Sequence, residues 1–425
     1  MKLFFISLFC FLSLNANVQL IKKNNDDSNT TLLVIGGIHG NEPGGYFAAS
    51  VLATHYTIHS KNLWIVPNLN QVSLQRDERG IYGDMNRKFA TIDPNDKDKE
   101  VVEEIKKIIL AEEVSLVLNL HDGNGFYRKQ HQGNIFNPNA WGQTCVIDQV
   151  KLDQNQPFGN LNEIASTVKE NLNQKLLKQH HTFDVKNTNT KYEDETMQLS
   201  LTYFAVTNNK PAFAIESSKN LPLLSQKVFY QLLAIEEFMK IMDISFSRSF
   251  DLNANALGEI LKEYGDLAIN NNISLNLNNI KKSLSFVPIK SSSNDFEFSH
   301  PLGSIQKIFG KYFVYIGNQK ITELHPQYFK LATNCPKEFA IEIDGKTSFK
   351  DFTSDIYVND DFKVLKTDDI RVNIIGYRSN IDESGIVIAL NQLDKSFSID
   401  NNSKTYRVEF YKQDEFCSML MVHFK

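Results

Sequence analysis

Short apolar runs alternate with segments of helical periodicity over the first 240 or so residues. The runs at residues 32–35, 63–66, 114–118 and 212–215 indicate buried strands. Apolar side chains at helical spacing predict helices over residues 46–55, 100–110, 161–178 and 228–242. Alternation of strands with helices predicts an α/β domain whose mixed or parallel sheet is flanked by helices.

The pattern changes after Asp243. Short β-type runs at residues 273–277, 312–316 and 386–390 are separated by clusters of Asn, Asp, Ser and Gly, with one helix near 257–264. We therefore expect residues 17–244 to form the α/β domain and the remainder to form one or two small β-rich domains. A boundary near 337–341 divides the remainder into a β-rich domain at residues 245–338 and a sandwich-like β-rich domain at residues 339–425.

The first residues have the pattern of a signal peptide. Lys2 is followed by an apolar run from Leu3 to Leu14, too short to span a membrane, which ends in Asn15-Ala16-Asn17. We predict a signal peptide over residues 1–16, export to the periplasm, and no stable membrane span after cleavage. Leu14 matches the small-residue preference before the cut poorly, so an uncleaved anchor stays open as an alternative.

Composition narrows the class of protein. With 425 residues, 42% hydrophobic and 22% charged, the chain is globular and too long for one ordinary core. A net charge of -5 gives no general attraction to nucleic acid, which we exclude as a partner. Beyond the signal segment, Cys145, Cys335 and Cys417 are scattered and contain no C-x-x-C pair, so we do not expect disulfides to define the fold.

A glycine-rich segment directly behind the first predicted strand carries the first candidate site. It runs from Gly36 to Gly45 and contains His39 and Glu42, three positions apart. On a turn at the carboxyl end of a strand, an imidazole nitrogen and a carboxylate oxygen at this spacing both reach one ion. The H-x-x-E motif alone is a weak signal, because a surface turn with two polar residues has the same pattern.

A second segment strengthens the metal hypothesis. His121 follows the strand predicted at 114–118, again at a carboxyl end, where open α/β sheets bind their ligands. His39, Glu42 and His121 form a two-histidine, one-carboxylate set, which is the ligation of hydrolytic zinc. We predict that these three residues bind one zinc ion.

Hydrolysis also requires a base and cations that hold the substrate. Glu216, at the end of the apolar run 212–215, is the predicted general base. The adjacent Asn86 and Arg87 are able to hold a carboxylate by amide and guanidinium donors together. Arg79, a short distance upstream, is a candidate for stabilising an oxyanion. Alternatively, Glu216 is a carboxylate at the end of a strand without a catalytic role, and Arg79 is a solvated surface arginine.

These motifs resemble, in this order, those of the zinc carboxypeptidases of the carboxypeptidase A type, which read H-x-x-E, N-R, H and E. The resemblance implies the zinc-carboxypeptidase fold. It also implies that the three ligands above bind zinc, that Asn86 and Arg87 hold the terminal carboxylate, and that Glu216 activates the water. The chain departs from the digestive members in its shorter spacing between Arg79 and Asn86. Tyr203 precedes Glu216 closely, which leaves the family's substrate-covering tyrosine without a clear counterpart.

Within this family, the export signal, the segment 121–128 and the β-rich remainder are most similar to the peptidoglycan D,L-carboxypeptidases that determine helical cell shape in bacteria. These enzymes are implied to release meso-diaminopimelate from the tripeptide stem L-Ala-γ-D-Glu-meso-diaminopimelate, so the implied partner is a muropeptide. Some of them replace the first zinc-binding histidine, whereas His39 is present here. Trp141, with Asp122 and Arg128, is a candidate for contacts to diaminopimelate because it lies near His121 in the sequence.

Two other functions are compatible with part of the pattern. Residues 37–42 and 84–87 are also similar to the N-acyl amino acid deacylases related to aspartoacylase and succinylglutamate desuccinylase. Those enzymes act on cytoplasmic metabolites, so the signal peptide favours the cell wall. A wall-binding scaffold with a decayed enzyme domain requires a missing ligand or base, and all four of these positions are occupied.

Overall fold

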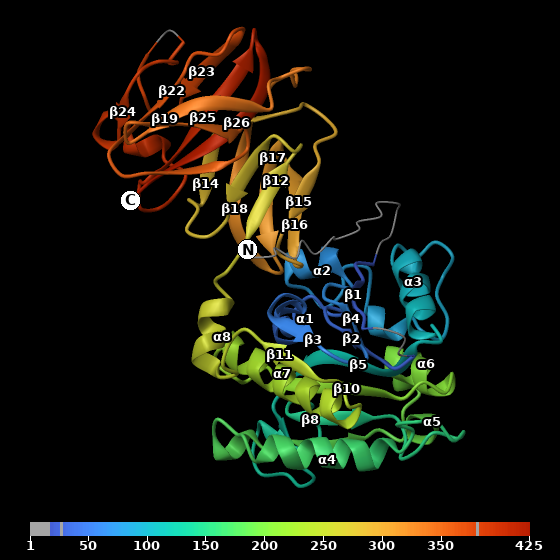
Figure 1. Ribbon diagram of the computed structural model, residues 1–425. Helices are drawn as coiled ribbons and strands as arrows, with labels where there is room; N and C mark the ends of the chain where they lie inside the picture. The colour runs from blue at the N-terminus through green and yellow to red at the C-terminus, as the bar shows by residue number, and fades with distance from the viewer. Residues whose placement is uncertain (1–17, 26–28, 380–381) are drawn as a thin grey trace. The chain divides into compact units, whose positions relative to one another are not determined.

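The computed structural model describes residues 18–25, 29–379 and 382–425, and these divide into two compact units (Figure 1). The first unit ends at Leu252 and the second begins at Asn253. The predicted signal peptide, residues 1–16, lies outside the described residues. In the part of the chain that is described, no helix is long and apolar enough to cross a membrane.

A seven-stranded mixed sheet forms the centre of the first unit. Its strands, in spatial order, are β1 (Ile21–Lys23), β4 (Asn62–Val66), β2 (Thr31–Ile35), β5 (Val114–Gly123), β10 (Ala212–Ser218), β8 (Thr144–Ile147) and β9 (Asp184–Asn187). The four central strands β4, β2, β5 and β10 run parallel, whereas β1 and β8 are antiparallel to their neighbours β4 and β10. The predicted α/β fold with a mixed sheet is confirmed.

Helices cover both faces of this sheet. Helices α1 (Pro43–His55), α4 (Leu161–Asn173) and α7 (Leu224–Ile241) pack against one another on one side, and α3 (Lys99–Ile109) and α6 (Leu201–Thr207) lie on the other (Figure 1). Every residue of β2 and β4 is buried, as expected for strands covered on both faces. Shorter elements complete the unit, namely α2 (Gln71–Arg76), α5 (Thr190–Glu193), β3 (Tyr56–Ile58), β6 (Phe126–Tyr127), β7 (Phe136–Asn137) and β11 (Phe246–Arg248).

Several boundaries differ from the prediction because polar groups extend or end the elements. Strand β5 continues to Gly123, well past the apolar run that ends at residue 118, because its register with β10 is kept through the pair His121 and Glu216. Helix α4 ends at Asn173 rather than at residue 178. Helix α8 (Ala254–Ile260) begins before residue 257 because the Asn253 side chain accepts hydrogen bonds from the first backbone N–H groups.

The second unit consists of β-strands apart from α8 and single helical turns, which confirms the predicted β-rich C-terminal part. Its first two sheets comprise β13 (Ile273–Asn276), β12 (Asp266–Ile269) and β15 (Phe296–Phe298), and then β14 (Ser283–Ile289), β18 (Gln319–Tyr328), β17 (Lys311–Ile316) and β16 (Gly303–Ile308). The strand predicted at 386–390 is only the two-residue β24 (Ile388–Ala389).

Two four-stranded sheets at the C-terminal end share one hydrophobic core. One contains β20 (Lys346–Asp351), β19 (Glu338–Ile343), β22 (Asp361–Val364) and β24, and the other contains β21 (Asp355–Val358), β26 (Glu415–Phe424), β25 (Thr405–Lys412) and β23 (Ile370–Ile374). Side chains from both sheets, among them Phe339, Phe362 and Phe410, are buried together between them. This is the arrangement of a β-sandwich.

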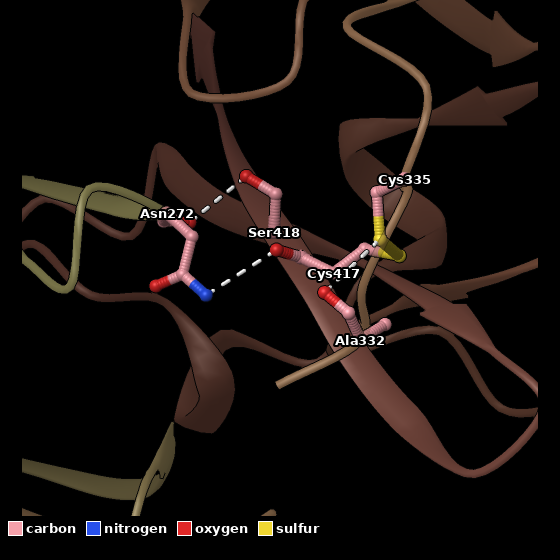
Figure 2. The surroundings of a disulfide bond; sticks show 5 residues. All are labelled: Asn272, Ala332, Cys335, Cys417 and Ser418. Atoms are coloured by element: carbon pink, nitrogen blue, oxygen red, sulfur yellow. Dashed lines mark hydrogen bonds between the residues drawn. A yellow bond between two sulfur atoms is a disulfide. The ribbon is translucent and has the colours of Figure 1, made fainter. Parts of the chain in front are cut away.

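A disulfide joins Cys335 to Cys417, a pairing that the scattered cysteines of the sequence did not indicate (Figure 2). Cys335 precedes β19 and Cys417 lies in β26, 82 positions later, so their proximity depends on tertiary structure. Beside the disulfide, the Asn272 side chain donates to the Cys417 carbonyl over 3.3 Å, and its backbone carbonyl accepts from the Ser418 hydroxyl over 2.9 Å. These contacts tie the β12–β13 turn to β26.

Candidate active site

The loop between β2 and α1 holds two of the predicted metal ligands. Its glycines permit approaches that no side chain would allow: a Cβ at Gly40 would lie 2.0 Å from the Ser73 carbonyl oxygen, and one at Gly44 would lie 2.3 Å from Asp122 Oδ1. Glu42 is the N-cap residue of α1, and Pro43 occupies the first turn, where its missing N–H costs no hydrogen bond. The chain therefore turns sharply and directs His39 and Glu42 toward β5.

His39, Glu42 and His121 meet in one buried cluster. Their ligand atoms all lie within 4.8 Å of one another, and each residue is at most 4% exposed. Nδ1 of His121 lies 2.8 Å from Glu42 Oε2, and Nδ1 of His39 lies 3.1 Å from the same oxygen. Although Glu42 Oε2 is this close, Nδ1 of His39 is buried and makes no well-aligned hydrogen bond to any of the described residues. Three convergent donor atoms, one of them buried and unsatisfied, fit a bound metal ion.

Asp84, which is not among the predicted site residues, completes the cluster. Its Oδ1 lies 2.8 Å from Nε2 of His39, and its Oδ2 accepts from Nε of Arg79 over 2.9 Å. Nη1 of Arg79 also donates to Glu42 Oε1 over 3.1 Å. The signal for Asp84 was its position two residues before Asn86, inside a motif whose other members were recognised.

These contacts shift the ionisation of the cluster. Burial alone would lower the pKa of His39, but the carboxylates of Glu42 and Asp84 raise it above its ordinary value. Burial would raise the pKa of Glu42, but His39 and His121 hold it well below its usual range. Burial would also raise the pKa of Asp84, but the hydrogen bonds and positive charges of His39 and Arg79 together hold it below its usual range.

Glu216 lies beside the cluster on β10, paired in register with His121 of β5. It is inside the strand, whose last residue is Ser218, rather than at its end. Burial raises the pKa of Glu216 to about 7; His121 opposes this shift, while the carboxylates of Glu42 and Asp122 add to it. A carboxyl group that titrates near neutral pH is suited to accept and return a proton.

A cavity of about 210 Å³ opens onto these residues. Besides the metal cluster and Glu216, its lining includes Arg79, Asn86, Arg87, Trp141, Val146, Met197, Thr202, Ala214 and Lys219. Oδ1 of Asn86 accepts from the Leu201 N–H over 2.9 Å, so the amide nitrogen is its donor end for a ligand. Nη1 of Arg87 donates to the backbone carbonyl of Asn86 over 2.9 Å, which holds the guanidinium against its own loop.

Comparison with known proteins agrees with this geometry. A family model described as the catalytic part of the carboxypeptidase controlling helical cell shape matches residues 1–262, and one described as the C-terminal domain of metallo-carboxypeptidase matches residues 332–425. The chain belongs to this family of carboxypeptidases. The predicted enzyme class, a metallocarboxypeptidase, is confirmed.

Crystal structures of the cell shape determinant protein Csd4 from Helicobacter pylori are similar over nearly the whole chain. The apo form has a TM-score of 0.91 and 33% identity, and the match covers 96% of this chain and 100% of that chain. The mDAP-bound form of Csd4, described as a D,L-carboxypeptidase, has a TM-score of 0.91 and 34% identity over 95% of this chain and 100% of that chain. Among curated proteins, none matches the sequence.

The cavity of this family member brings together the predicted metal ligands, Glu216, Arg79, Asn86, Arg87 and Trp141, but the side chains near His121 differ in what they contact. Trp141 lines the cavity, and Nζ of Lys186 lies 4.3 Å from its ring centroid. Asp122 also lines the cavity, but its carboxylate is held by the Gly44 N–H over 2.9 Å and by the Ser217 hydroxyl. The guanidinium of Arg128 donates to backbone carbonyls, including that of His180 over 2.6 Å, and does not line the cavity.

Proposed function

We propose that the protein is a zinc-dependent D,L-carboxypeptidase of the periplasm that trims muropeptide tripeptides to dipeptides. The released product is meso-diaminopimelate, and the trimming influences cell shape. The observation that carries the proposal is the 33% identity to Csd4 over 96% of the chain, together with a complete set of metal-ligating, basic and carboxylate-binding side chains in one cavity. Structures of Csd4 with mDAP and with tripeptide bound support a wall-derived substrate.

The residues of the cavity have separable tasks in this proposal. His39, Glu42 and His121 hold the ion, for which zinc fits the two-histidine, one-carboxylate donor set. When bound, zinc supplies a Lewis acid that polarises the scissile carbonyl and lowers the pKa of water. Glu216 takes a proton from the attacking water and passes it to the leaving amine.

The substrate is held by the cationic and amide side chains. Asn86 and Arg87 bind the terminal carboxylate through N–H donors. Arg79, already oriented by Glu42 and Asp84, places its guanidinium where negative charge develops on the carbonyl oxygen. Trp141 covers the bound C-terminal residue from the cavity wall.

A periplasmic location is supported by two independent features. The apolar segment at residues 3–14 has the pattern of an export signal. The disulfide between Cys335 and Cys417 requires an oxidising compartment to persist. In the cytoplasm, where the deacylase of the alternative function would act, the two thiols would stay reduced.

The direct test is incubation of the purified protein with the tripeptide L-Ala-γ-D-Glu-meso-diaminopimelate, followed by mass analysis. Release of diaminopimelate that stops on addition of a chelator is the expected result. Hydrolysis of N-acetylaspartate or succinylglutamate without action on the tripeptide would overturn the proposal in favour of the deacylase.

Metal analysis tests the zinc assignment separately. The wild type should hold one zinc per chain, and Glu42→Ala or His121→Ala should lose most of it, because one of three protein ligands is removed. Stoichiometric zinc in either variant would contradict the ligand set.

A further inference from the structure

Lys219 is a cavity-lining cation to which the proposed mechanism gives no task. It follows β10 directly, and its backbone N–H donates to the Gly123 carbonyl over 2.8 Å. Its ammonium lies 3.4 Å from Glu42 Oε1, and its side chain is 27% exposed. An ammonium has three N–H donors, so contact with one carboxylate oxygen leaves donors for a ligand in the cavity.

The register of β10 places Lys219 on a definite side of the reaction centre. Ala214 and Glu216 point to the same face of the strand because they are two residues apart, and both line the cavity. Ala214 pairs with the buried Val146 of β8 and is itself 6% exposed. The order along the strand is therefore a buried apolar floor at Ala214, the general base at Glu216, and the more exposed Lys219 toward the opening.

This order fixes the direction of a bound peptide. The scissile bond has to lie at Glu216 and the metal ligands. The clamp for the terminal carboxylate packs on the α6 side, where Asn86 accepts from the Leu201 N–H and Nη2 of Arg87 lies 3.6 Å from the Met197 sulfur. The residue that follows the scissile bond therefore occupies the inner part of the cavity, and the acyl residue lies toward Lys219.

We propose that Lys219 binds a carboxylate on the acyl side of the scissile bond and so determines specificity. In the γ-linked stem peptide this group is the α-carboxylate of D-Glu, which the γ-linkage leaves free. Three carbon atoms separate it from the scissile carbonyl group. The inference rests on the proposed function and deepens it: the enzyme selects γ-D-glutamyl peptides with a free α-carboxylate over their α-amides.

The test compares two synthetic tripeptides that differ only in this group, carrying either the α-carboxylate or an α-carboxamide on the D-Glu residue. Diaminopimelate release by the zinc-loaded full chain gives kcat/KM for each. The wild type should prefer the carboxylate about 10- to 100-fold, the range for a hydrogen bond to a charged group. Lys219→Met should lose about this factor on the carboxylate peptide and change little on the amide, so that the preference disappears.

Two further variants separate specificity from support of the metal site. Lys219→Arg keeps the charge and should retain most of the preference. Lys129→Met removes another lysine of the same unit, whose side chain is 71% exposed and outside the cavity lining, and should leave both rates unchanged. Equal loss of both rates in Lys219→Met, with or without loss of zinc, would show that Lys219 only stabilises Glu42 and would overturn the inference.

The proposed function and this inference fail in different ways. A wild type that releases diaminopimelate from both peptides at the same rate would overturn the role of Lys219 and leave the carboxypeptidase assignment standing. A wild type that releases it from neither would overturn both.

Discussion

Nε2 of His39 lies 2.8 Å from Oδ1 of Asp84, so the imidazole presents Nδ1 to the metal cluster while its other nitrogen is held by a carboxylate. This contact fixes the tautomer and the ring orientation, and it makes Nδ1 a better electron donor. Asp84 is held in turn by Arg79 and by the Asn86 backbone N–H, both from the loop that also contributes the carboxylate clamp. The metal site and the substrate site are thus both held by residues of the same loop, 79–87.

Removal of the Asp84 carboxylate should weaken metal binding. Asp84→Asn keeps the size of the side chain but loses its negative charge, and we expect metal affinity to fall by about 10- to 100-fold. Competition with a chelator of known affinity measures the change. Asp153→Asn, at an exposed position of the same unit, is the control. Unchanged affinity in Asp84→Asn would show that the contact with His39 does not tune the site.

Replacement of Glu216 should separate chemistry from binding. Glu216→Ala removes the proposed base but none of the three metal ligands, so zinc content and substrate affinity should be kept. Turnover should fall by a factor on the order of 10² or more, as for other general bases. Single-turnover kinetics and calorimetric binding of the tripeptide give the two quantities. Activity equal to that of the parent enzyme would contradict the mechanism.

Arg87 should matter only for substrates with a free terminal carboxylate. Arg87→Ala removes charged donors from the clamp, so kcat/KM for such peptides should fall by roughly 100-fold, whereas analogues with an amidated terminus should lose little. Arg76→Ala, which removes an exposed arginine outside the cavity lining, should change neither. A similar loss on both kinds of peptide would argue that Arg87 supports the fold instead of the substrate.

The site was predictable to the extent that its chemistry follows the ends of hydrophobic strands. The apolar runs before His39, His121 and Glu216 located three parallel strands whose carboxyl ends meet at one edge, so the ligands and the base could be placed together. The end of β5 could not be predicted from the sequence, because the strand continues through polar residues whose burial depends on the neighbouring β10.

Contacts between residues far apart in the chain could not be predicted from the sequence pattern. Nothing in the spacing of Cys335 and Cys417 indicates that β26 returns beside the segment before β19. Likewise, Asp122 carries the same signal as His121 in the sequence, yet the alternation of the strand directs its carboxylate to the α1 terminus instead of to the cluster.

The disulfide should stabilise the second unit alone. It closes a loop of 82 positions, for which chain entropy gives a contribution of about 4 kcal/mol. Both tryptophans, Trp64 and Trp141, lie in the first unit, so their fluorescence reports on that unit only. In Cys335→Ala/Cys417→Ala, calorimetry should show one transition moved to lower temperature while the fluorescence transition stays in place. A shift of the fluorescence transition would refute the assignment to one unit.

Asp148 gives the first unit a pH-dependent stability. It follows β8, is 2% exposed and accepts a hydrogen bond from the Thr190 hydroxyl. Burial raises its pKa from 3.8 to about 6, although the hydroxyls of Thr190 and Thr202 oppose the shift. The folded chain therefore retains a proton between about pH 4 and pH 6 that the unfolded chain has lost. The contribution of Asp148 to the unfolding free energy therefore falls as the pH rises through this window and becomes constant above it.

Asp148→Asn should remove this loss of stability above pH 4, because an amide keeps the acceptor oxygen and never ionises. We expect the variant to exceed the wild type in unfolding free energy by about 1–3 kcal/mol at pH 7.5, the range that a pKa change of this size allows. At pH 4 the difference should shrink to roughly 0.5 kcal/mol, since Asp148 is then neutral in the folded chain and only about half ionised in the unfolded chain. Urea unfolding followed by tryptophan fluorescence measures the first unit at both pH values, with Asp153→Asn as the exposed control. An advantage of the variant that is the same at pH 4 and at pH 7.5 would show that packing, and not the ionisation of Asp148, is responsible.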